Sequence, residues 1–144
     1  MKKLNEISLD GKRVLIRVDF NVPIIKGIIL NDFRIKSALK TIKYCLEHGT
    51  SVVLMSHLGR PKNDIDENLS LFPIAEHLED LLGINILFSD DCVSKESIDL
   101  SNNLKSGEVH LLENLRFNNG ELDNDDTFSF LLSKHGDVFI NDAF

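Results

Sequence analysis

The chain has 144 residues, which is one domain's worth of sequence, and 42% of them are hydrophobic while 27% are charged. Its formal net charge of −7 argues against nucleic acid or an anionic membrane surface as the main partner, because both attract an excess of Lys and Arg. No stretch approaches the roughly 20 apolar residues of a membrane helix, and the N-terminus lacks the apolar core of a signal peptide, so we expect a cytoplasmic protein.

Several common signatures of binding sites are missing from the sequence. Cys45 and Cys92 stand far apart, with no second Cys or paired His at metal-ligand spacing, so neither a zinc site nor a disulfide framework is expected. We interpret both as ordinary core or near-surface thiols. The eight glycines form neither a Walker loop nor a dinucleotide fingerprint, and no nucleophile-elbow serine occurs. If a nucleotide is used, this segment does not bind it through a recognised loop.

Strand and helix patterns alternate along the chain. Short apolar runs rich in β-branched residues predict buried strands at residues 14–18, 52–55, 84–88, 109–112 and 138–140, and a short hairpin at 24–30. Apolar residues at helical spacing predict helices that begin near positions 31–32, 70 and 125 and stop at Gly49, Gly83 and Gly136, with Ser70 and Ser94 as possible caps. The sequence therefore predicts a three-layer, Rossmann-like α/β domain with a mostly parallel sheet and helices on both faces.

Polar side chains follow the predicted strands at the points where the strands end. In an open parallel sheet these ends share one edge, and ligands bind there. Three Arg and one His at that edge would form a cationic pocket on an acidic protein, and guanidinium groups suit phosphate or carboxylate. The implied ligand is a small molecule with more than one negative charge. The strand ends and the start of the first helix together hold Asp19, Asn21, Arg34, His57, Arg60, Arg116 and Asp142.

Each of these residues also has an ordinary structural explanation. Arg34 could pair with Asp32, and Arg116 could pair with Glu113, because exposed ion pairs are common and weak. A His such as His57 that follows a strand is more often a hydrogen-bonded turn residue than a catalyst. It is the shared location of these residues that favours a site.

Five stretches of the sequence together resemble the phosphoglycerate kinase family, in that family's order and at its spacing. The resemblance runs the whole length of the chain but covers the N-terminal domain of the family. It implies that residues 1–144 are an incomplete N-terminal domain that binds 3-phosphoglycerate, and that the nucleotide-binding domain is absent. The five stretches are RVLIRVDFNVP (13–23), DFRI (32–35), SHLGRPK (56–62), GEVHLLENLRF (107–117) and DVFINDAF (137–144).

The resemblance also implies a reaction. The family reversibly transfers a phosphoryl group from MgATP to the carboxylate of 3-phosphoglycerate, giving 1,3-bisphosphoglycerate and MgADP, as a step of glycolysis. Arg34 matches the family's catalytic arginine. The nucleotide would bind the missing domain, so this segment alone should be inactive, and the intact protein is expected to be a monomer. Residues that match the family's substrate contacts are Asp19, Phe20, Asn21, Arg34, His57, Leu58, Gly59, Arg60 and Arg116.

Two other functions compete with this interpretation. A haloacid-dehalogenase-like phosphatase would use Asp19 and Asn21 as its Asp-x-Asp pair and Asp137 with Asp142 as its Mg²⁺ motif. Asn21 cannot transfer a proton as a carboxylic acid would, and Asp137 precedes its strand instead of following it. A non-catalytic binding module would hold an anion in the same pocket with no second substrate. A second α/β domain after Phe144 in the gene would establish the kinase.

Overall fold

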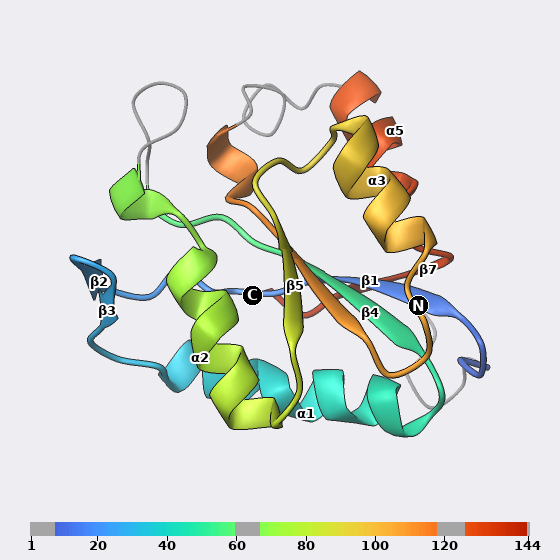
Figure 1. Cartoon of the computed structure of the whole chain (residues 1–144), viewed down its shortest axis with the longest axis horizontal. Coiled ribbons are helices and arrows are strands. Elements are labelled where there is room, and N and C mark those ends of the chain that lie inside the picture. The colour runs from blue at the N-terminus through green and yellow to red at the C-terminus, as the bar shows by residue number, and fades with distance from the viewer. Residues whose placement is uncertain (1–7, 60–66, 118–125, 144) are drawn as a thin grey trace.

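The computed structural model of the protein describes residues 8–59, 67–117 and 126–143. The strands of its main sheet are β1 (Arg13–Arg17), β4 (Ser51–Met55), β5 (Ile86–Ser89), β6 (Val109–Leu112) and β7 (Val138–Asn141). The helices are α1 (Phe33–Glu47), α2 (Phe72–Leu82), α3 (Lys95–Asn102) and α5 (Asp126–Ser133). Within the described ranges the main sheet is parallel throughout, in the order β5-β6-β4-β1-β7 (Figure 1). None of the described helices is long and apolar enough to cross a membrane.

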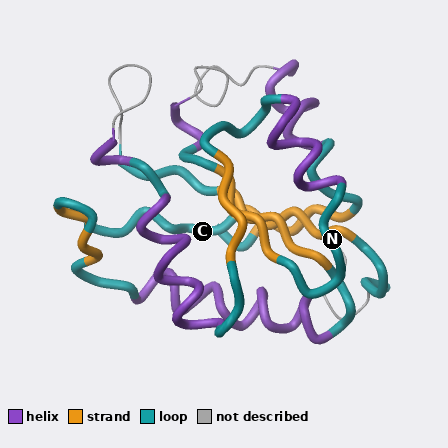
Figure 2. Tube along the Cα trace, in the orientation of Figure 1, coloured by secondary structure: helices purple, strands orange, loops and turns teal. Residues whose placement is uncertain are grey.

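Helices cover both faces of this sheet, which confirms the predicted three-layer α/β arrangement (Figure 2). Successive side chains of a strand point to opposite faces. Val14 and Ile16 of β1 therefore pack in the larger core beneath α1 and α2, whereas Leu15 packs in a smaller core with α5. Cys45 of α1 lies in the larger core, where burial raises the pKa of its thiol to about 11. Cys92 is buried as well, and both thiols are free.

The bounds of two elements differ from the predicted ones. The third strand starts at Ile86 and not at residue 84, because the left-handed backbone of Gly83 (φ 70°) still turns the chain away from α2 before pairing with β6 begins. The N-cap of α2 is Leu71, one residue later than the predicted Ser70. The Ser70 hydroxyl nevertheless accepts a hydrogen bond from the backbone N–H of Phe72 at 3.1 Å. Ser94 caps α3 as predicted, and the predicted helix start at residue 125 lies outside the described residues.

The predicted hairpin is present as β2 (Ile24–Ile25) paired antiparallel with β3 (Ile28–Ile29). Lys26 and Gly27 form its turn with positive φ angles of 52° and 78°, the signs that a type I′ hairpin turn requires. The hairpin projects to one side of the sheet, between β1 and the start of α1 (Figure 1).

A chain of buried polar side chains fixes α3 and the end of α5 to the sheet. We call its members Ser89, Ser101, His110 and His135 the histidine network, and all four are buried. The Ser101 hydroxyl lies 2.8 Å from His110 Nδ1 and 2.6 Å from His135 Nδ1. His110 Nε2 bonds to the Ser89 hydroxyl, and His135 Nε2 lies 2.6 Å from the carbonyl oxygen of Cys92. Because every ring nitrogen has a partner, the two imidazoles are accommodated in the core without an unsatisfied polar atom.

Candidate functional site

The segment after β1 leaves the sheet in a tight turn. Phe20 is completely buried, and its backbone N–H donates to the Ser56 hydroxyl at 2.9 Å. The backbone N–H of Asn21 donates to Asp19 Oδ1 at 3.1 Å, which is the side-chain turn that Asp favours. Asp19 and Asn21 therefore sit at the carboxyl end of the sheet as predicted, whereas the Phe20 side chain belongs to the core.

Arg34 lies beside this turn, in the first turn of α1. Its Nη1 atom donates to the carbonyl oxygen of Asn21 at 2.8 Å and lies 3.3 Å from Asp19 Oδ1. The alternative pairing with Asp32 is not formed, because the Asp32 carboxylate contacts His77 Nε2 at 2.8 Å and Lys36 Nζ at 3.6 Å. About half of the Arg34 side chain is exposed (51%), so its guanidinium is held in place yet accessible.

Two open cavities meet at Arg34. One has a volume of about 420 Å³ and the other about 250 Å³, and Arg34 and Phe33 line both. Each cavity therefore presents a guanidinium beside one exposed aromatic ring. The remaining residues of the larger cavity are Asp19, Ser37, Ala38 and Asp142, and those of the smaller are Asn21, Val22, Pro23 and Asn31.

The segment after β4 is fixed to the segment after β1. The backbone N–H of Gly59 donates to Asn21 Oδ1 at 2.9 Å. Gly59 has a φ of +60°, and a Cβ atom built there would lie 2.7 Å from Leu69 Cδ2, so this position favours glycine. Leu58 is buried in the core, and His57 is partly buried at the edge. Arg60, the fourth predicted residue of this segment, lies outside the described residues.

The segment after β6 contributes Asn114, whose side chain is buried and makes four hydrogen bonds. Its Oδ1 atom accepts from the backbone N–H of Leu58 at 3.1 Å and from that of Arg116 at 3.0 Å. Its Nδ2 atom donates to the carbonyl oxygens of Leu58 at 2.8 Å and Leu69 at 3.0 Å. We call Asn21, Ser56 and Asn114 the tip network, because their side chains connect the segments that follow β1, β4 and β6.

Arg116 lies in a short 3-10 helix, Leu115–Phe117, directly after β6. Its Nε atom is buried and makes no hydrogen bond to any described residue. The alternative partner Glu113 is occupied elsewhere, since its carboxylate accepts from the Ser70 hydroxyl at 2.6 Å and from the backbone N–H of Leu71 at 2.8 Å. Arg116 thus carries a buried donor that the described residues leave unsatisfied, and it lines neither cavity at Arg34.

The pocket around Arg34 is less cationic than the sequence predicts. Asp142 follows β7 and lines the larger cavity, where its backbone N–H donates to the carbonyl oxygen of Arg17 at 2.8 Å. Burial raises the pKa of the Asp142 carboxyl, and a hydrogen bond from Thr41 opposes that shift. Asp19 further offsets the charge of Arg34. The positive charge of Arg34 is therefore partly neutralised by acidic residues of the same cavity.

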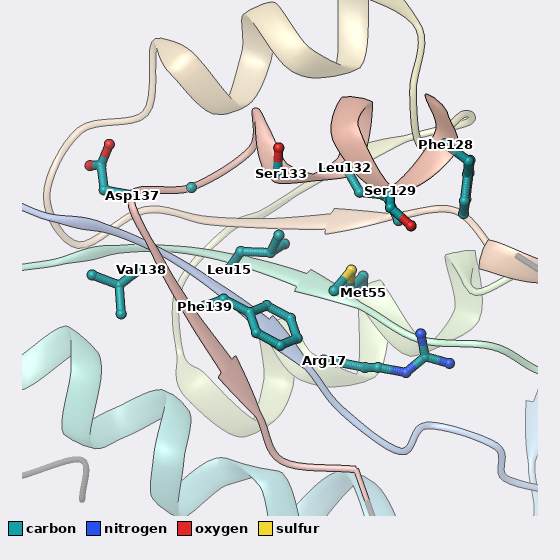
Figure 3. Close-up of a pocket in the computed structure, with 11 residues that line it drawn as sticks. Leu15, Arg17, Met55, Phe128, Ser129, Leu132, Ser133, Asp137, Val138 and Phe139 are labelled. Atoms are coloured by element: carbon teal, nitrogen blue, oxygen red, sulfur yellow. The ribbon is translucent and has the colours of Figure 1, made fainter. Parts of the chain in front are cut away.

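A larger groove lies on the other face of the sheet, between α5 and the strands β1 and β7 (Figure 3). Its volume is about 510 Å³, and side chains such as Leu15, Met55 and Phe139 make most of its wall apolar. Arg17 lies at one end of this groove and Asp137 at the other. None of the residues that the sequence pattern singled out for the anion site lines this groove. The groove is therefore larger than the cavities at Arg34 but lacks the predicted anion-binding residues.

The structure argues against the phosphatase alternative. Asp137 lies at the start of β7, where its carboxylate accepts from the backbone N–H of Arg13 at 3.0 Å. Arg13 begins β1, whereas Asp19 follows its end, so Asp137 and Asp19 occupy opposite ends of the sheet. Among the described residues no three His, Cys, Asp or Glu side chains form a possible metal site.

The sequence reasoning missed Ser56, Glu113 and Asn114, which hold the site together without lining its cavities. The signal was present, since Ser56 and Asn114 are polar residues at the ends of buried strands, as are the residues that were selected. The role of Ser56 and Asn114 could not be predicted from the sequence, because their partners are backbone atoms of segments 36 to 56 residues away.

Comparisons with known proteins give a consistent result. A family model described as phosphoglycerate kinase matches residues 4–144. Phosphoglycerate kinase of Borrelia duttonii (strain Ly) is 47% identical over 144 residues, which are 100% of this chain and 37% of that protein. The enzyme of Moorella thermoacetica is 50% identical over 141 residues, or 98% of this chain and 36% of that protein.

Solved structures agree with the sequence matches. Phosphoglycerate kinase from Pyrococcus horikoshii OT3 superposes with a TM-score of 0.89 at 34% identity, covering 99% of this chain and 36% of that one. The enzyme from Coxiella burnetii superposes with a TM-score of 0.85, also at 34% identity, covering 97% of this chain and 34% of that one. The chain spans little more than a third of the length of these relatives, and it belongs to the phosphoglycerate kinase family.

Proposed function

We propose that the protein carrying this chain transfers a phosphoryl group reversibly between MgATP and the carboxylate of 3-phosphoglycerate, and that this segment supplies the 3-phosphoglycerate site. The observation that carries the proposal is the placement of Arg34, which Asn21 and Asp19 hold at the junction of two open cavities. Membership of the phosphoglycerate kinase family supports the choice of reaction.

The proposed substrate carries a phosphate and a carboxylate, and the edge of the sheet offers donors for both. Arg34 and Arg116 provide guanidinium groups, which bind such anions in a bidentate manner. The side chains of Phe20 and Leu58 lie in the core, and their backbone N–H and C=O groups bond to other residues of the protein. We therefore propose that these two residues shape the site and support its neighbouring contacts. Asp19, Asn21, His57 and Gly59 complete the described part of the proposed site, and Arg60 is proposed as a further contact.

Arg34 is proposed as the catalytic residue. The acceptor of the phosphoryl group is a carboxylate, which is already an anion, so the reaction needs no general base. It needs in-line placement of the reactants and positive charge on the phosphoryl group while that group moves. The guanidinium of Arg34 meets the second need, because two hydrogen bonds orient it before the substrate arrives.

The nucleotide is proposed to bind elsewhere in the protein. The described residues contain no cluster of three potential metal ligands, and no glycine-rich phosphate loop occurs in the sequence. We therefore propose that MgATP or MgADP binds to sequence that the relatives have beyond the matched third. From the family resemblance and the character of the sequence we also propose that the protein acts in the cytoplasm as a monomer.

The test is an assay of the complete protein that carries this chain, with MgATP and 3-phosphoglycerate, in which ADP is measured over time. We expect ADP formation that depends on 3-phosphoglycerate, and we expect the 144-residue chain alone to be inactive. Binding of 3-phosphoglycerate with no ADP formation by the complete protein would instead identify a binding module. Release of inorganic phosphate without nucleotide would identify a phosphatase, and either result would overturn the proposal.

A further inference from the structure

Asn114 makes four side-chain hydrogen bonds at the carboxyl edge of the sheet, although it lines neither cavity at Arg34. An Asn side chain offers one oxygen with two lone pairs and one nitrogen with two protons, so four hydrogen bonds exhaust its capacity. Asn114 makes all four and is completely buried. No other residue type supplies two acceptor sites and two donors in that shape.

Two of the four bonds fix a single residue of the proposed substrate loop. Both the N–H and the C=O of Leu58 bond to the Asn114 amide, at 3.1 and 2.8 Å. Leu58 lies between His57 and Gly59, so the Asn114 amide also restrains the positions of these two neighbours. Gly59 then donates to Asn21 Oδ1, which carries the constraint across to the segment that follows β1.

The third bond fixes the proposed contact on the neighbouring segment. Asn114 Oδ1 also accepts from the backbone N–H of Arg116 at 3.0 Å. One oxygen atom therefore positions Leu58 and Arg116 relative to each other, although 58 residues of sequence separate them. The fourth bond, to the carbonyl oxygen of Leu69, holds the approach to α2 against the same point.

We propose that Asn114 is a positioning residue for the 3-phosphoglycerate site, which it sets by holding the His57–Leu58–Gly59 segment and Arg116 in one arrangement. This inference rests on the proposed function. Asn114 is not a catalytic residue, because it touches the loop backbone and not the cavities. Loss of its amide would displace contacts on two segments at once, and a displacement of about 1 Å can cost about a hundredfold in rate.

A matched control is available in Ser101 of the histidine network. Ser101 is also completely buried and bonds two groups that would lose their partner on truncation, yet its partners are His110 and His135 on the α3 and α5 face. Ser101→Ala and Asn114→Ala should both lower thermal stability. If Asn114 has a positioning role, Asn114→Ala should also weaken the affinity for 3-phosphoglycerate, whereas Ser101→Ala should not.

The experiment measures KM and kcat of the complete protein for 3-phosphoglycerate and for MgATP, in wild type, Asn114→Ala and Ser101→Ala, at a temperature where each is folded by circular dichroism. For Asn114→Ala we expect KM for 3-phosphoglycerate to rise about tenfold or more, with KM for MgATP within about twofold of wild type. For Ser101→Ala we expect both KM values to stay within about twofold of wild type.

Each outcome decides between a positioning role and a purely structural one. A folded Asn114→Ala protein with a normal KM for 3-phosphoglycerate would overturn the inference, and so would equal increases in both variants. If Asn114→Ala does not fold, Asn114→Ser takes its place, because the hydroxyl keeps one donor and its acceptor sites and should give an intermediate KM. A wild-type protein without activity toward 3-phosphoglycerate would overturn the proposed function first, and this inference with it.

Discussion

Two networks of buried polar side chains involve β6, and they differ in the chemistry of their members. The tip network is centred on Asn114, just past the end of the strand, and it consists of amide and hydroxyl groups. The histidine network is centred on His110, within the strand, and includes two imidazoles. Amides and hydroxyls do not titrate near neutral pH, whereas imidazoles do. The hydrogen bonds of the tip network should therefore be insensitive to pH over a range in which the stability of the fold changes with pH.

The histidine network has one consistent assignment of protons. The carbonyl oxygen of Cys92 can only accept, so His135 Nε2 donates to it and His135 Nδ1 accepts from the Ser101 hydroxyl. Because the Ser101 hydroxyl already donates its hydrogen to His135, its oxygen accepts from His110 Nδ1. His110 Nε2 then accepts from the Ser89 hydroxyl. Each group donates once in the same direction along the chain. A proton added to either imidazole would break that order, because the new N–H would face a group that already donates.

Cys92 links the histidine network to Glu113, the residue that precedes Asn114 of the tip network. Its carbonyl oxygen accepts from His135, and its thiol donates to the carbonyl oxygen of Glu113 at 2.8 Å. A thiol is a weak donor, so the link carries little energy compared with the amide and imidazole bonds on either side. We therefore expect variants of one network to act nearly independently of variants of the other.

The largest expected effect belongs to the site itself. Arg34→Ala in the complete protein should lower kcat roughly a hundredfold, because one preorganised donor to the transferring phosphoryl group is lost. This corresponds to a loss of about 3 kcal/mol of transition-state stabilisation. The free energy of unfolding should change little, since half of the Arg34 side chain is exposed. Steady-state kinetics together with urea unfolding would check both statements. A near-normal kcat would remove Arg34 from the catalytic role.

The next effect concerns acid and the histidine network. Burial, together with the neighbouring His135, lowers the pKa of His110 from 6.5 to about 4, and burial also lowers the pKa of His135. As the pH falls below 6.5 the unfolded chain takes up protons that the folded chain does not, so stability decreases down to about pH 4. The loss attributable to His110 should be about 3 kcal/mol.

Urea unfolding at several pH values between 4 and 7 would measure that loss. His110→Gln keeps an amide for hydrogen bonding but removes the titrating group, so stability should depend less steeply on pH in this variant than in wild type. Equal slopes in the two proteins would mean that His110 does not control the acid response. A substitution in the tip network such as Asn114→Ser should leave the slope unchanged.

Ser101→Ala should cost about 2 kcal/mol of unfolding free energy. The hydroxyl serves His110 and His135, and its removal leaves one imidazole N–H and one imidazole lone pair buried without a partner. Chemical denaturation at pH 7 would measure the loss. A change below about 0.5 kcal/mol would indicate that water enters the network in place of the hydroxyl.

The smallest effect is expected for Arg116. Arg116→Ala should weaken 3-phosphoglycerate binding by about 1.5 kcal/mol, or about tenfold, because the side chain contributes a charged donor and not the catalytic group. Binding to wild type should weaken with added salt, and binding to the variant should weaken less steeply, since one charge is missing. Titrations at two ionic strengths would compare the slopes. Parallel slopes would make Arg116 a structural residue.

Patterns within a short window of sequence predicted the fold well. The alternation of apolar runs with amphipathic helices gave the parallel sheet, and the Ser94 cap was correct because its partner, Ser97, lies three residues away. The predicted cap at Ser70 was displaced because the carboxylate of Glu113 binds the backbone N–H of Leu71. No local pattern could reveal a partner that lies just past the end of β6, 42 residues later in the chain.

The candidate site was predictable in its location and less so in its construction. Asp19, Asn21 and Arg34 were identified because parallel strands bring their carboxyl ends to one edge, and the structure brings these three residues together. The bracing by Asn114 and the glycine at position 59 depend on contacts between distant segments. The partial neutralisation of Arg34 by Asp19 could likewise not be predicted, because it depends on the 3.3 Å distance between Arg34 Nη1 and Asp19 Oδ1.

The central claim is that the carboxyl edge of this sheet, and not the larger groove beneath α5, holds the anionic substrate. The most direct measurement is a titration of the ¹⁵N-labelled 144-residue chain with 3-phosphoglycerate, followed by backbone amide chemical shifts. We expect saturable changes at residues 19–21, 34, 57–59 and 116, with residues 128–133 unaffected. Changes confined to residues 128–139, or no saturable change in a chain whose spectrum shows it to be folded, would contradict the account.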